Sequence, residues 1–380
     1  MQYSSLIREW GELSLKSARR FLQFALPATL LITSCASGAS AAGTTNAASE
    51  NSTGTTNAAS EISTETETDS AAEIPAGSES AEGAAAAAST TDQATVYAPA
   101  ADYPNPYEME TYDSVPEYLS ERHDDVDYGT LDVDVEYYSE TAGDVKYCNV
   151  LLPPGYDESQ EYPVLYMYHG FGGRYDSHVH EGSILQTLYG NMLSEGLTVP
   201  MIIVGADMYT DLLADKDDKS DAELRPCYDK GIDDLAFDLM PFIESRYSVK
   251  TGRRNTAVSG VSQGATEALA AGFKWQSKIG FIGSFAPCTG VIPVPFASHS
   301  FWSWPILDDL TIESPDTVPY YIYLSVGSED PWCIKSTQYY GEVMDEKGIP
   351  NQNDLVEGYD HGNEMWELGH YNFLQKIFLD

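Results

Sequence analysis

The chain has 380 residues and a formal net charge of −39, because 59 acidic residues stand against only 20 basic ones. Such a charge would repel the phosphates of DNA or RNA, so the composition argues against a nucleic-acid partner. It is compatible with solubility in an acidic or salty extracellular setting. The length allows one large domain or two of ordinary size.

The first 35 residues are typical of an export signal. Basic residues precede a short apolar run, residues 21–32, which is too short for a comfortable membrane span. The run leads into Leu31-Ile-Thr-Ser-Cys35, and a small-residue site directly before a cysteine resembles the bacterial lipobox. We therefore expect Cys35 to carry a lipid anchor that holds the protein at the bacterial cell surface. A plain signal peptide cleaved within residues 39–42 is the alternative.

Residues 36–110 have the composition of a spacer. Up to about residue 100 they are mostly Ala, Ser, Thr, Gly, Asn and Glu, and residues 43–50 recur almost unchanged as residues 54–61. Such a segment cannot bury enough apolar surface to offset its chain entropy. We expect a disordered acidic linker that ends in a Pro-rich lead-in at residues 103–107.

Residues 111–380 alternate between predicted strands and helices. The strands are expected at residues 131–137, 146–152, 162–168, 201–206, 255–259, 280–285, 319–326 and 353–357. The helices are expected at residues 184–193, 232–247, 265–272, 337–347 and 369–379. This alternation predicts one α/β domain with a doubly wound, mainly parallel sheet. In such sheets, functional residues gather in loops at the carboxyl ends of the strands.

A Gly-x-Ser-x-Gly pentapeptide, Gly260-Val-Ser-Gln-Gly264, lies between a predicted strand and a predicted helix. In this context the serine is expected at a tight, strained turn, with glycines that let the strand and the helix approach closely. Ser262 is therefore the candidate nucleophile. An unreactive small-residue turn is the alternative interpretation of the pentapeptide taken alone.

A serine nucleophile needs a base, and the base needs an acceptor that orients it. His361 follows the last predicted strand, and Asp330 closes the loop after the preceding strand. The chain order is then Ser, Asp, His, which is the order in α/β hydrolases. Glu329 and Asp360 remain alternatives for the acid.

Two backbone N–H groups are needed to stabilise a tetrahedral intermediate. One is expected from Gln263, directly after the nucleophile. The other is expected from the glycine-rich loop His169-Gly-Phe-Gly-Gly173, with Phe171 as the donor. The alternative for this loop is an ordinary turn, with His169 in a structural role.

The domain resembles carbohydrate esterase family one, the feruloyl and acetylxylan esterases among the esterase D-like α/β hydrolases. The matching stretches run in order through nearly the whole domain: Leu152-Pro-Pro-Gly-Tyr156, residues 169–173, residues 238–247, residues 260–264, residues 327–330, and His361 with Trp366 and Asn372. The resemblance implies an α/β-hydrolase fold and places the family's nucleophile, acid and base on Ser262, Asp330 and His361. It places the oxyanion donors on Phe171 and Gln263.

The substrate implied by the resemblance is a feruloyl or acetyl ester of plant cell-wall xylan. Trp302, in an aromatic-rich loop, together with Trp332 and Trp366 beside the acid and base, could bind a sugar or a feruloyl ring. A satellite core is the alternative for the Trp302 loop. Other possible functions are a catalytically silent glycan-binding protein, a peptidase or an acyltransferase on the same fold.

Four cysteines remain after Cys35, namely Cys148, Cys227, Cys288 and Cys333. An even number in an exported chain allows disulfides, and Cys288 with Cys333 is the pair to test first because both follow strands near the site. The spacing of these cysteines does not resemble a zinc site. No metal or other cofactor is expected, although His178 and His180 could in principle hold a metal.

Overall fold

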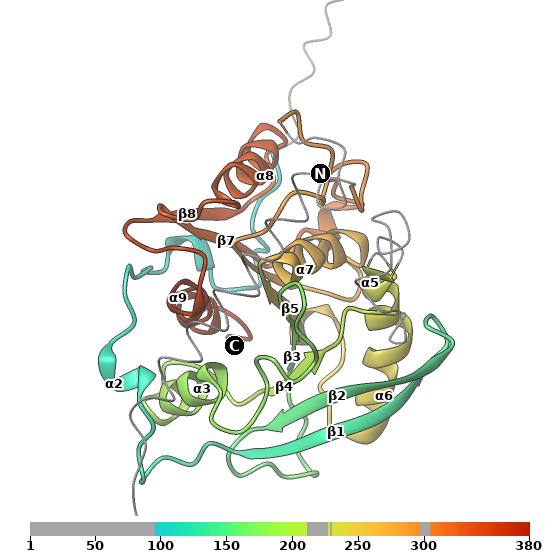
Figure 1. The fold of residues 1–380 in the computed structure, drawn as a ribbon, viewed down its shortest axis with the longest axis vertical. Coiled ribbons are helices and arrows are strands. Elements are labelled where there is room, and N and C mark those ends of the chain that lie inside the picture. The colour runs from blue at the N-terminus through green and yellow to red at the C-terminus, as the bar shows by residue number, and fades with distance from the viewer. Residues whose placement is uncertain (1–95, 211–226, 229, 297–304) are drawn as a thin grey trace, which may run out of the picture. The chain divides into compact units, whose positions relative to one another are not determined.

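The structure is a computed structural model that describes residues 96–210, 227–228, 230–296 and 305–380. Its strands are β1 (Thr130–Ser139), β2 (Asp144–Leu152), β3 (Val164–Tyr168), β4 (Ile202–Ala206), β5 (Thr256–Val261), β6 (Phe281–Phe285), β7 (Tyr321–Gly327) and β8 (Gln352–Val356). They form one sheet in the order β1-β2-β4-β3-β5-β6-β7-β8 (Figure 1). The strands from β4 to β8 in this order are parallel, whereas the β1–β2 hairpin joins β4 in antiparallel orientation.

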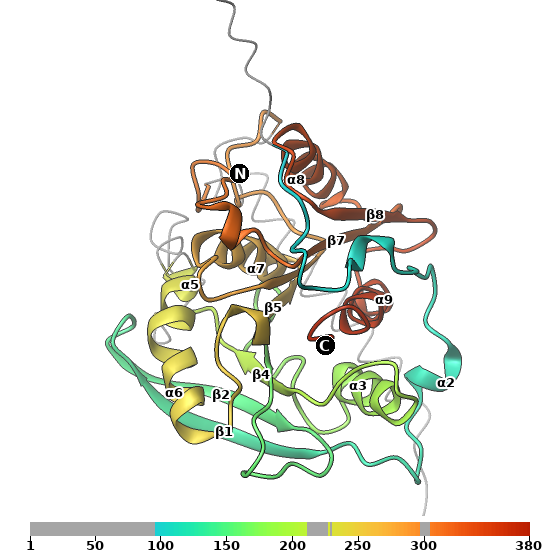
Figure 2. The ribbon, with the colours of Figure 1, turned by 180° about the vertical axis from the view of Figure 1, so that it is seen from behind.

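Helices cover both faces of this sheet, as the two opposite views show (Figures 1 and 2). One face packs against α5 (Gly231–Asp234), α6 (Met240–Arg246), α7 (Gln263–Lys274) and α8 (Ile334–Glu346). The other face packs against α3 (Ile184–Ser194) and α9 (Asn363–Leu374), and the short helix α2 (Glu117–Ser120) contacts α3. The expected α/β-hydrolase architecture, a doubly wound and mostly parallel sheet, is confirmed.

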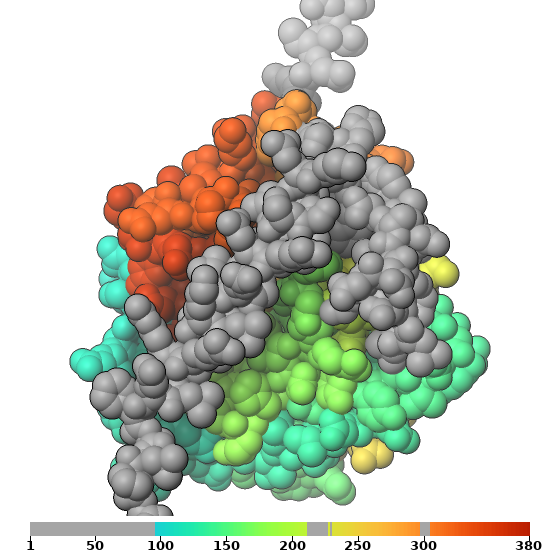
Figure 3. All heavy atoms as spheres, viewed as in Figure 1, coloured from blue at the N-terminus to red at the C-terminus, as the bar shows by residue number. Residues whose placement is uncertain are grey.

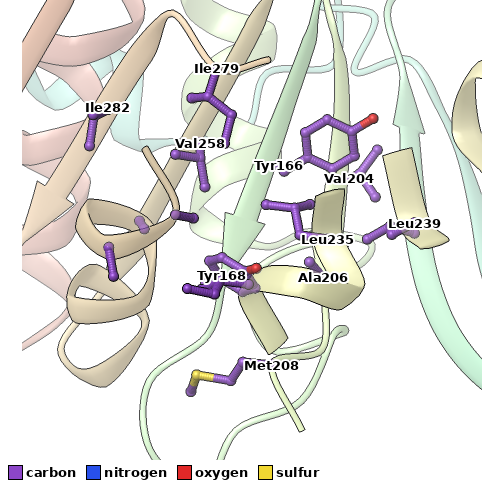
Figure 4. Close-up of a cluster of buried hydrophobic side chains, with 14 of the residues drawn as sticks. Tyr166, Tyr168, Val204, Ala206, Met208, Leu235, Leu239, Val258, Ile279 and Ile282 are labelled. Atoms are coloured by element: carbon purple, nitrogen blue, oxygen red, sulfur yellow. The ribbon is translucent and has the colours of Figure 1, made fainter. Parts of the chain in front are cut away.

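The two faces of the sheet have separate apolar cores because side chains alternate along each strand. On β3, Tyr166 and Tyr168 belong to one core, while Leu165 and Met167 belong to the other. Figure 4 shows part of the first core, where Tyr166 lies in one cluster with Leu235 and other apolar side chains. This two-sided burial explains why the strand is a continuous apolar run in the sequence.

The folded unit begins earlier than the expected boundary at residue 111. Tyr103 donates a hydrogen bond from its hydroxyl to the carbonyl of Lys376 at 2.8 Å and accepts one from the N–H of Leu379 at 3.0 Å. The Tyr107 hydroxyl donates to the carbonyl of Pro350 at 3.0 Å. Residues 96–110 therefore belong to the folded unit, because their tyrosines anchor an otherwise Pro-rich segment.

Two predicted helices differ from those observed. The last helix runs over Asn363–Leu374, so it begins six residues before the expected start at residue 369. The helix expected at 232–247 contains a π-helical turn at Leu235–Leu239 before Pro241. Proline lacks the N–H of a regular helix and its ring crowds the preceding turn, which accounts for the widened turn at this point.

The described helices include none that is both long and apolar enough to cross a membrane.

In the space-filling view, the β1–β2 hairpin forms one rim of the visible face and the C-terminal part of the chain forms the opposite rim (Figure 3).

Candidate active site

Ser262 occupies a strained turn between β5 and α7. Its backbone has φ 56° and ψ −121°, a conformation that side chains other than glycine rarely adopt. A Cβ atom at Gly260 would meet the carbonyl oxygen of Gly264, and one at Gly264 would meet the carbonyl oxygen of His169. The two glycines are therefore required by close backbone approaches. They allow this strand-to-helix turn, the nucleophile elbow, to present the Ser262 hydroxyl at the edge of the sheet.

His361, in the loop after β8, reaches this hydroxyl, and Asp330, in the loop after β7, reaches His361. The strand register aligns Gly327 with Val356, so the loops that follow these two strands start side by side. The Ser262 hydroxyl is 2.9 Å from Nε2 of His361, and Nδ1 of His361 is 2.6 Å from Oδ2 of Asp330. A neutral imidazole protonated on Nδ1 would donate to Asp330 and accept from Ser262, which is the arrangement that activates a serine.

Asp330 is held by hydrogen bonds from the start of the loop that precedes α8. Its Oδ1 accepts from the backbone N–H groups of Trp332 and Cys333, each at 2.8 Å. The two alternative acids, Glu329 and Asp360, are exposed, whereas Asp330 is buried. Asp330 is therefore the one of these three carboxylates that accepts a hydrogen bond from Nδ1 of His361.

The pKa values of the pair support a charged carboxylate next to a basic imidazole. Burial opposes ionisation of both groups, but their mutual hydrogen bond and charge outweigh it. As a result, the pKa of Asp330 lies below and that of His361 above its ordinary value. Asp330 therefore remains ionised at neutral pH and can stabilise an imidazolium.

The expected oxyanion donors lie next to the elbow. Gln263 is the first residue of α7, where a helix has no internal acceptor for its N–H groups. The loop after β3 passes over the nucleophile, since a Cβ atom at Gly170 would be 3.6 Å from Cβ of Ser262. Gln263 and the loop that contains Phe171 therefore lie next to Ser262.

Two tyrosines that no sequence motif indicated, Tyr209 and Tyr228, support the loop after β3. The Tyr209 hydroxyl accepts from the N–H of Gly172 at 2.9 Å and from the Tyr228 hydroxyl at 3.0 Å. The rings of Phe171 and Tyr228 are stacked with their centroids 6.0 Å apart. Tyr209 could have been noticed in the sequence, because it follows β4 at the same carboxyl edge as the other site residues.

Aromatic rings flank the base. Trp332 and Trp366 meet the His361 ring edge to face, with centroids 5.2 and 5.7 Å apart. Trp332 is 55% exposed and Phe171 is 46% exposed, although both are large apolar side chains. The structure thus brings Trp332 and Trp366 to the site, while the third expected aromatic, Trp302, lies outside the described residues, as does Cys35.

Comparison with known proteins identifies the family. Residues 139–370, well over half of the chain, match the model of the family named Esterase. The chain belongs to this family. A solved CE1 ferulic acid esterase from Anaeromyces mucronatus, determined in complex with ferulic acid, is 30% identical, with a TM-score of 0.65 over 71% of this chain and 98% of that one. The protein is accordingly a CE1-like esterase, a serine hydrolase that acts on carboxylic esters.

Two further relatives add detail. An endo-1,4-β-xylanase/feruloyl esterase of Xylanibacter ruminicola is 30% identical over 149 residues, which are 38% of this chain and only 19% of that protein. The chain therefore spans about a fifth of the length of this curated relative. The feruloyl esterase module of Clostridium thermocellum, complexed with sinapinate, is 15% identical with a TM-score of 0.52 over 75% of this chain, and this similarity shows the fold alone.

Two cysteines of this esterase lie at the site. Cys288, after β6, has its Sγ 3.7 Å from the Ser262 hydroxyl and 3.3 Å from Sγ of Cys333. All four described cysteines are free thiols in the structure, but the pair selected from the sequence is the one that is brought together.

The described residues include one group of side chains close enough together to hold a metal. Asp330, Cys333 and His361 have ligand atoms within 4.8 Å of one another. Asp330 and His361 already share a hydrogen bond in the chain that leads to Ser262, so a metal here would disrupt the arrangement that activates the serine. The group therefore fits the esterase mechanism better than metal binding.

The other described histidines of the esterase have structural contacts. His169 is buried beneath the loop after β3, with Nδ1 2.7 Å from the carbonyl of Gly170. His370 is buried, and its Nδ1 is 2.8 Å from the carbonyl of Trp366. Burial lowers the pKa of His178 to about 3 and that of His370 to about 4, so both stay neutral at physiological pH.

Proposed function

We propose that this esterase removes feruloyl or acetyl groups from plant cell-wall xylan, with feruloyl esters as the preferred class, through an acyl-enzyme intermediate. The observation that carries the proposal is the continuous hydrogen-bonded chain from Asp330 through His361 to Ser262, next to the half-exposed ring of Trp332. The ferulic acid esterase similarity supports the same substrate class.

The mechanism follows from the contacts of these residues. His361 takes the proton of Ser262 as the serine oxygen attacks the ester carbonyl, and Asp330 stabilises the imidazolium that forms. The N–H groups of Gln263 and Phe171 then stabilise the oxyanion of the tetrahedral intermediate. His361 gives the proton to the departing sugar oxygen, so the sugar leaves with a free hydroxyl and the acyl group stays on Ser262. A water molecule, activated by the same histidine, releases the acid and restores the serine.

The preference for a feruloyl group is argued from the aromatic side chains at the site. The large rings of Trp332 and Phe171 are half-exposed, so they offer apolar surface that a bound substrate could cover. Trp332 lies against the base, and Phe171 lies in the loop that passes over the nucleophile. A flat aromatic acyl group could stack on such rings, with a gain of about 0.5–1.5 kcal/mol beyond simple burial. An acetyl group is too small to use this surface.

A comparison of two esters tests the substrate proposal. Trp332→Ala is expected to lower kcat/KM for methyl ferulate by about tenfold, because it removes a stacking surface, and to change the hydrolysis of p-nitrophenyl acetate much less. Tyr138→Ala is the matched control, since Tyr138 is 57% exposed but lies on β1 at the far edge of the sheet. Equal losses on both esters would contradict an aromatic acyl site.

The cellular location is proposed from the N-terminal sequence. A lipid on Cys35 would tether the esterase to the outer face of a bacterial membrane, where polysaccharide is accessible. Metabolic labelling with a fatty acid should mark the wild-type protein in a bacterial host and should fail for Cys35→Ala. Labelling that persists in the variant would contradict the anchor, whatever the substrate proves to be.

A further inference from the structure

Cys288 and Cys333 lie 45 positions apart in the sequence, on loops that follow neighbouring strands. Cys288 follows β6, and Cys333 lies at the start of α8, after β7. Their sulfur atoms are 3.3 Å apart, so a modest change of side-chain torsions would bring them to bonding distance. The mechanism proposed above uses neither thiol.

The two thiols differ in access and acidity. Cys333 is fully buried, whereas Cys288 is partly exposed and contacts the nucleophile. A hydrogen bond from Cys333 lowers the pKa of Cys288, and the nearby His361 adds to this effect against the opposing influence of burial. The same interaction, together with burial, raises the pKa of Cys333. Cys288 is thus the better nucleophile, and Cys333 is positioned to react second.

We propose that Cys288 and Cys333 form a reversible disulfide when the esterase meets a low-molecular-weight disulfide, and that Cys333 thereby keeps bulky adducts away from Ser262. Cys288 attacks one sulfur of oxidised glutathione and releases one glutathione. The sulfur of Cys333 then attacks Cys288 and releases the second glutathione. The two protein thiols are oxidised, the glutathione disulfide is reduced to two thiols, and the two protons of the protein thiols end on the released glutathione.

The geometry explains why the second step matters. Cys288 Sγ is 3.7 Å from the Ser262 hydroxyl, so a glutathione held on Cys288 would occupy space at the nucleophile. A bond to Cys333 instead directs the sulfur toward the loop that carries Asp330 and links that loop to the one after β6. The oxidised enzyme therefore keeps its access to substrate and gains a covalent brace beside the acid.

Cys148 provides an internal comparison. It is fully buried on β2, and its thiol donates to the carbonyl of Val135 at 3.7 Å. Burial raises its pKa to about 12, so it has very little thiolate at neutral pH. Oxidised glutathione should leave this cysteine unmodified in the folded protein.

The test exposes the wild-type esterase, Cys333→Ser and Cys288→Ser to oxidised glutathione. Intact mass and peptide mapping report the modification, and each activity is referred to the reduced form of the same protein. We expect the wild type to lose two thiols without an adduct and to keep most of its activity. Cys333→Ser should carry one glutathione on Cys288 and lose most of its activity, and a reductant should restore it. Cys288→Ser should keep its activity.

Three results would overturn the inference. In the first, the wild type carries a stable glutathione on Cys288. In the second, Cys288 and Cys333 both remain reduced throughout. In the third, Cys333→Ser with glutathione on Cys288 hydrolyses ester at the rate of its unmodified form. If Cys333→Ser does not fold, Cys333→Ala serves in its place. Each activity is compared with that of the same protein in its reduced form, and the adduct is detected by mass. The result therefore does not depend on which ester the enzyme prefers.

Discussion

Asp330 and Asp234 are both buried carboxylates with a basic partner 2.6 Å away, but their surroundings differ. Asp330 is bonded to His361, whose second nitrogen reaches the Ser262 hydroxyl at the sheet edge. Asp234 is bonded to Lys146, which also donates to the carbonyl of Asp207, while the Tyr137 hydroxyl donates to the same carboxylate. Lys146 is completely buried, so no substrate can reach it.

The comparison teaches that a short ion pair does not identify a reactive site by itself. The Asp330 pair contains a group that can take up and release a proton and that contacts a nucleophile. The Asp234 pair links β2 to α5 and is buried, so removing one partner would leave an uncompensated charge inside the domain. Substitutions in the two pairs should therefore affect different properties.

Among substitutions in these two ion pairs, the largest effect is expected for Asp330→Asn. The amide cannot stabilise the imidazolium and favours the wrong histidine tautomer, so kcat should fall by about 10⁴-fold. Steady-state kinetics on methyl ferulate measure this loss, and a thermal unfolding curve close to that of the wild type would show that the fold is retained. A kcat within about tenfold of the wild-type value would show that another residue acts as the acid.

Lys146→Met should instead destabilise the domain. It leaves Asp234 buried without its cation, which costs about 3–5 kcal/mol of unfolding free energy. Lys274→Met is the matched control, because the Lys274–Asp233 ion pair has a similar distance of 2.7 Å but is about one-third exposed. Its loss should cost no more than about 1 kcal/mol. Denaturant unfolding of both variants distinguishes these cases, and equal losses would remove the distinction between the buried and the surface pair.

The smallest effect is a shift in the pH profile. His361 must be neutral to accept the serine proton, so activity should fall as the pH decreases through its pKa. Asp330 raises that pKa, so the midpoint in the wild type should lie above the ordinary histidine value of about 6.5. In Asp330→Asn, the midpoint of the residual activity should move to lower pH. An unchanged midpoint would mean that the carboxylate does not act on this histidine.

The convergence of the site was predictable because each of its three residues follows a predicted strand: β5 and β7 are fully buried, and β8 is the more exposed last strand. Ser262, Asp330 and His361 follow β5, β7 and β8, and parallel strands bring their carboxyl ends to one edge. The acid remained ambiguous in the sequence because Glu329 and Asp360 lie in the same loops. Only the three-dimensional structure shows which carboxylate is turned inward to His361.

Other features depend on contacts that sequence patterns do not record. Lys146 lies between Val145 and Tyr147 in β2, so alternation along the strand predicts an outward-facing lysine, yet it is buried and paired. Tyr103 and Tyr107 lie in a Pro-rich stretch that reads as a linker, yet they bond to segments more than 200 residues later. Tyr209 supports the loop after β3 through its hydroxyl, a long-range contact between two strand ends.

Covalent labelling with an aryl phosphonate ester, followed by peptide mass mapping, tests most directly whether Ser262 is the nucleophile. We predict a single label on the peptide that contains Ser262, unchanged labelling in Ser259→Ala, and none in Ser262→Ala, which should also lose ester hydrolysis. Labelling at another residue, or hydrolysis at the wild-type rate by Ser262→Ala, would contradict the central claim that this elbow supplies the nucleophile.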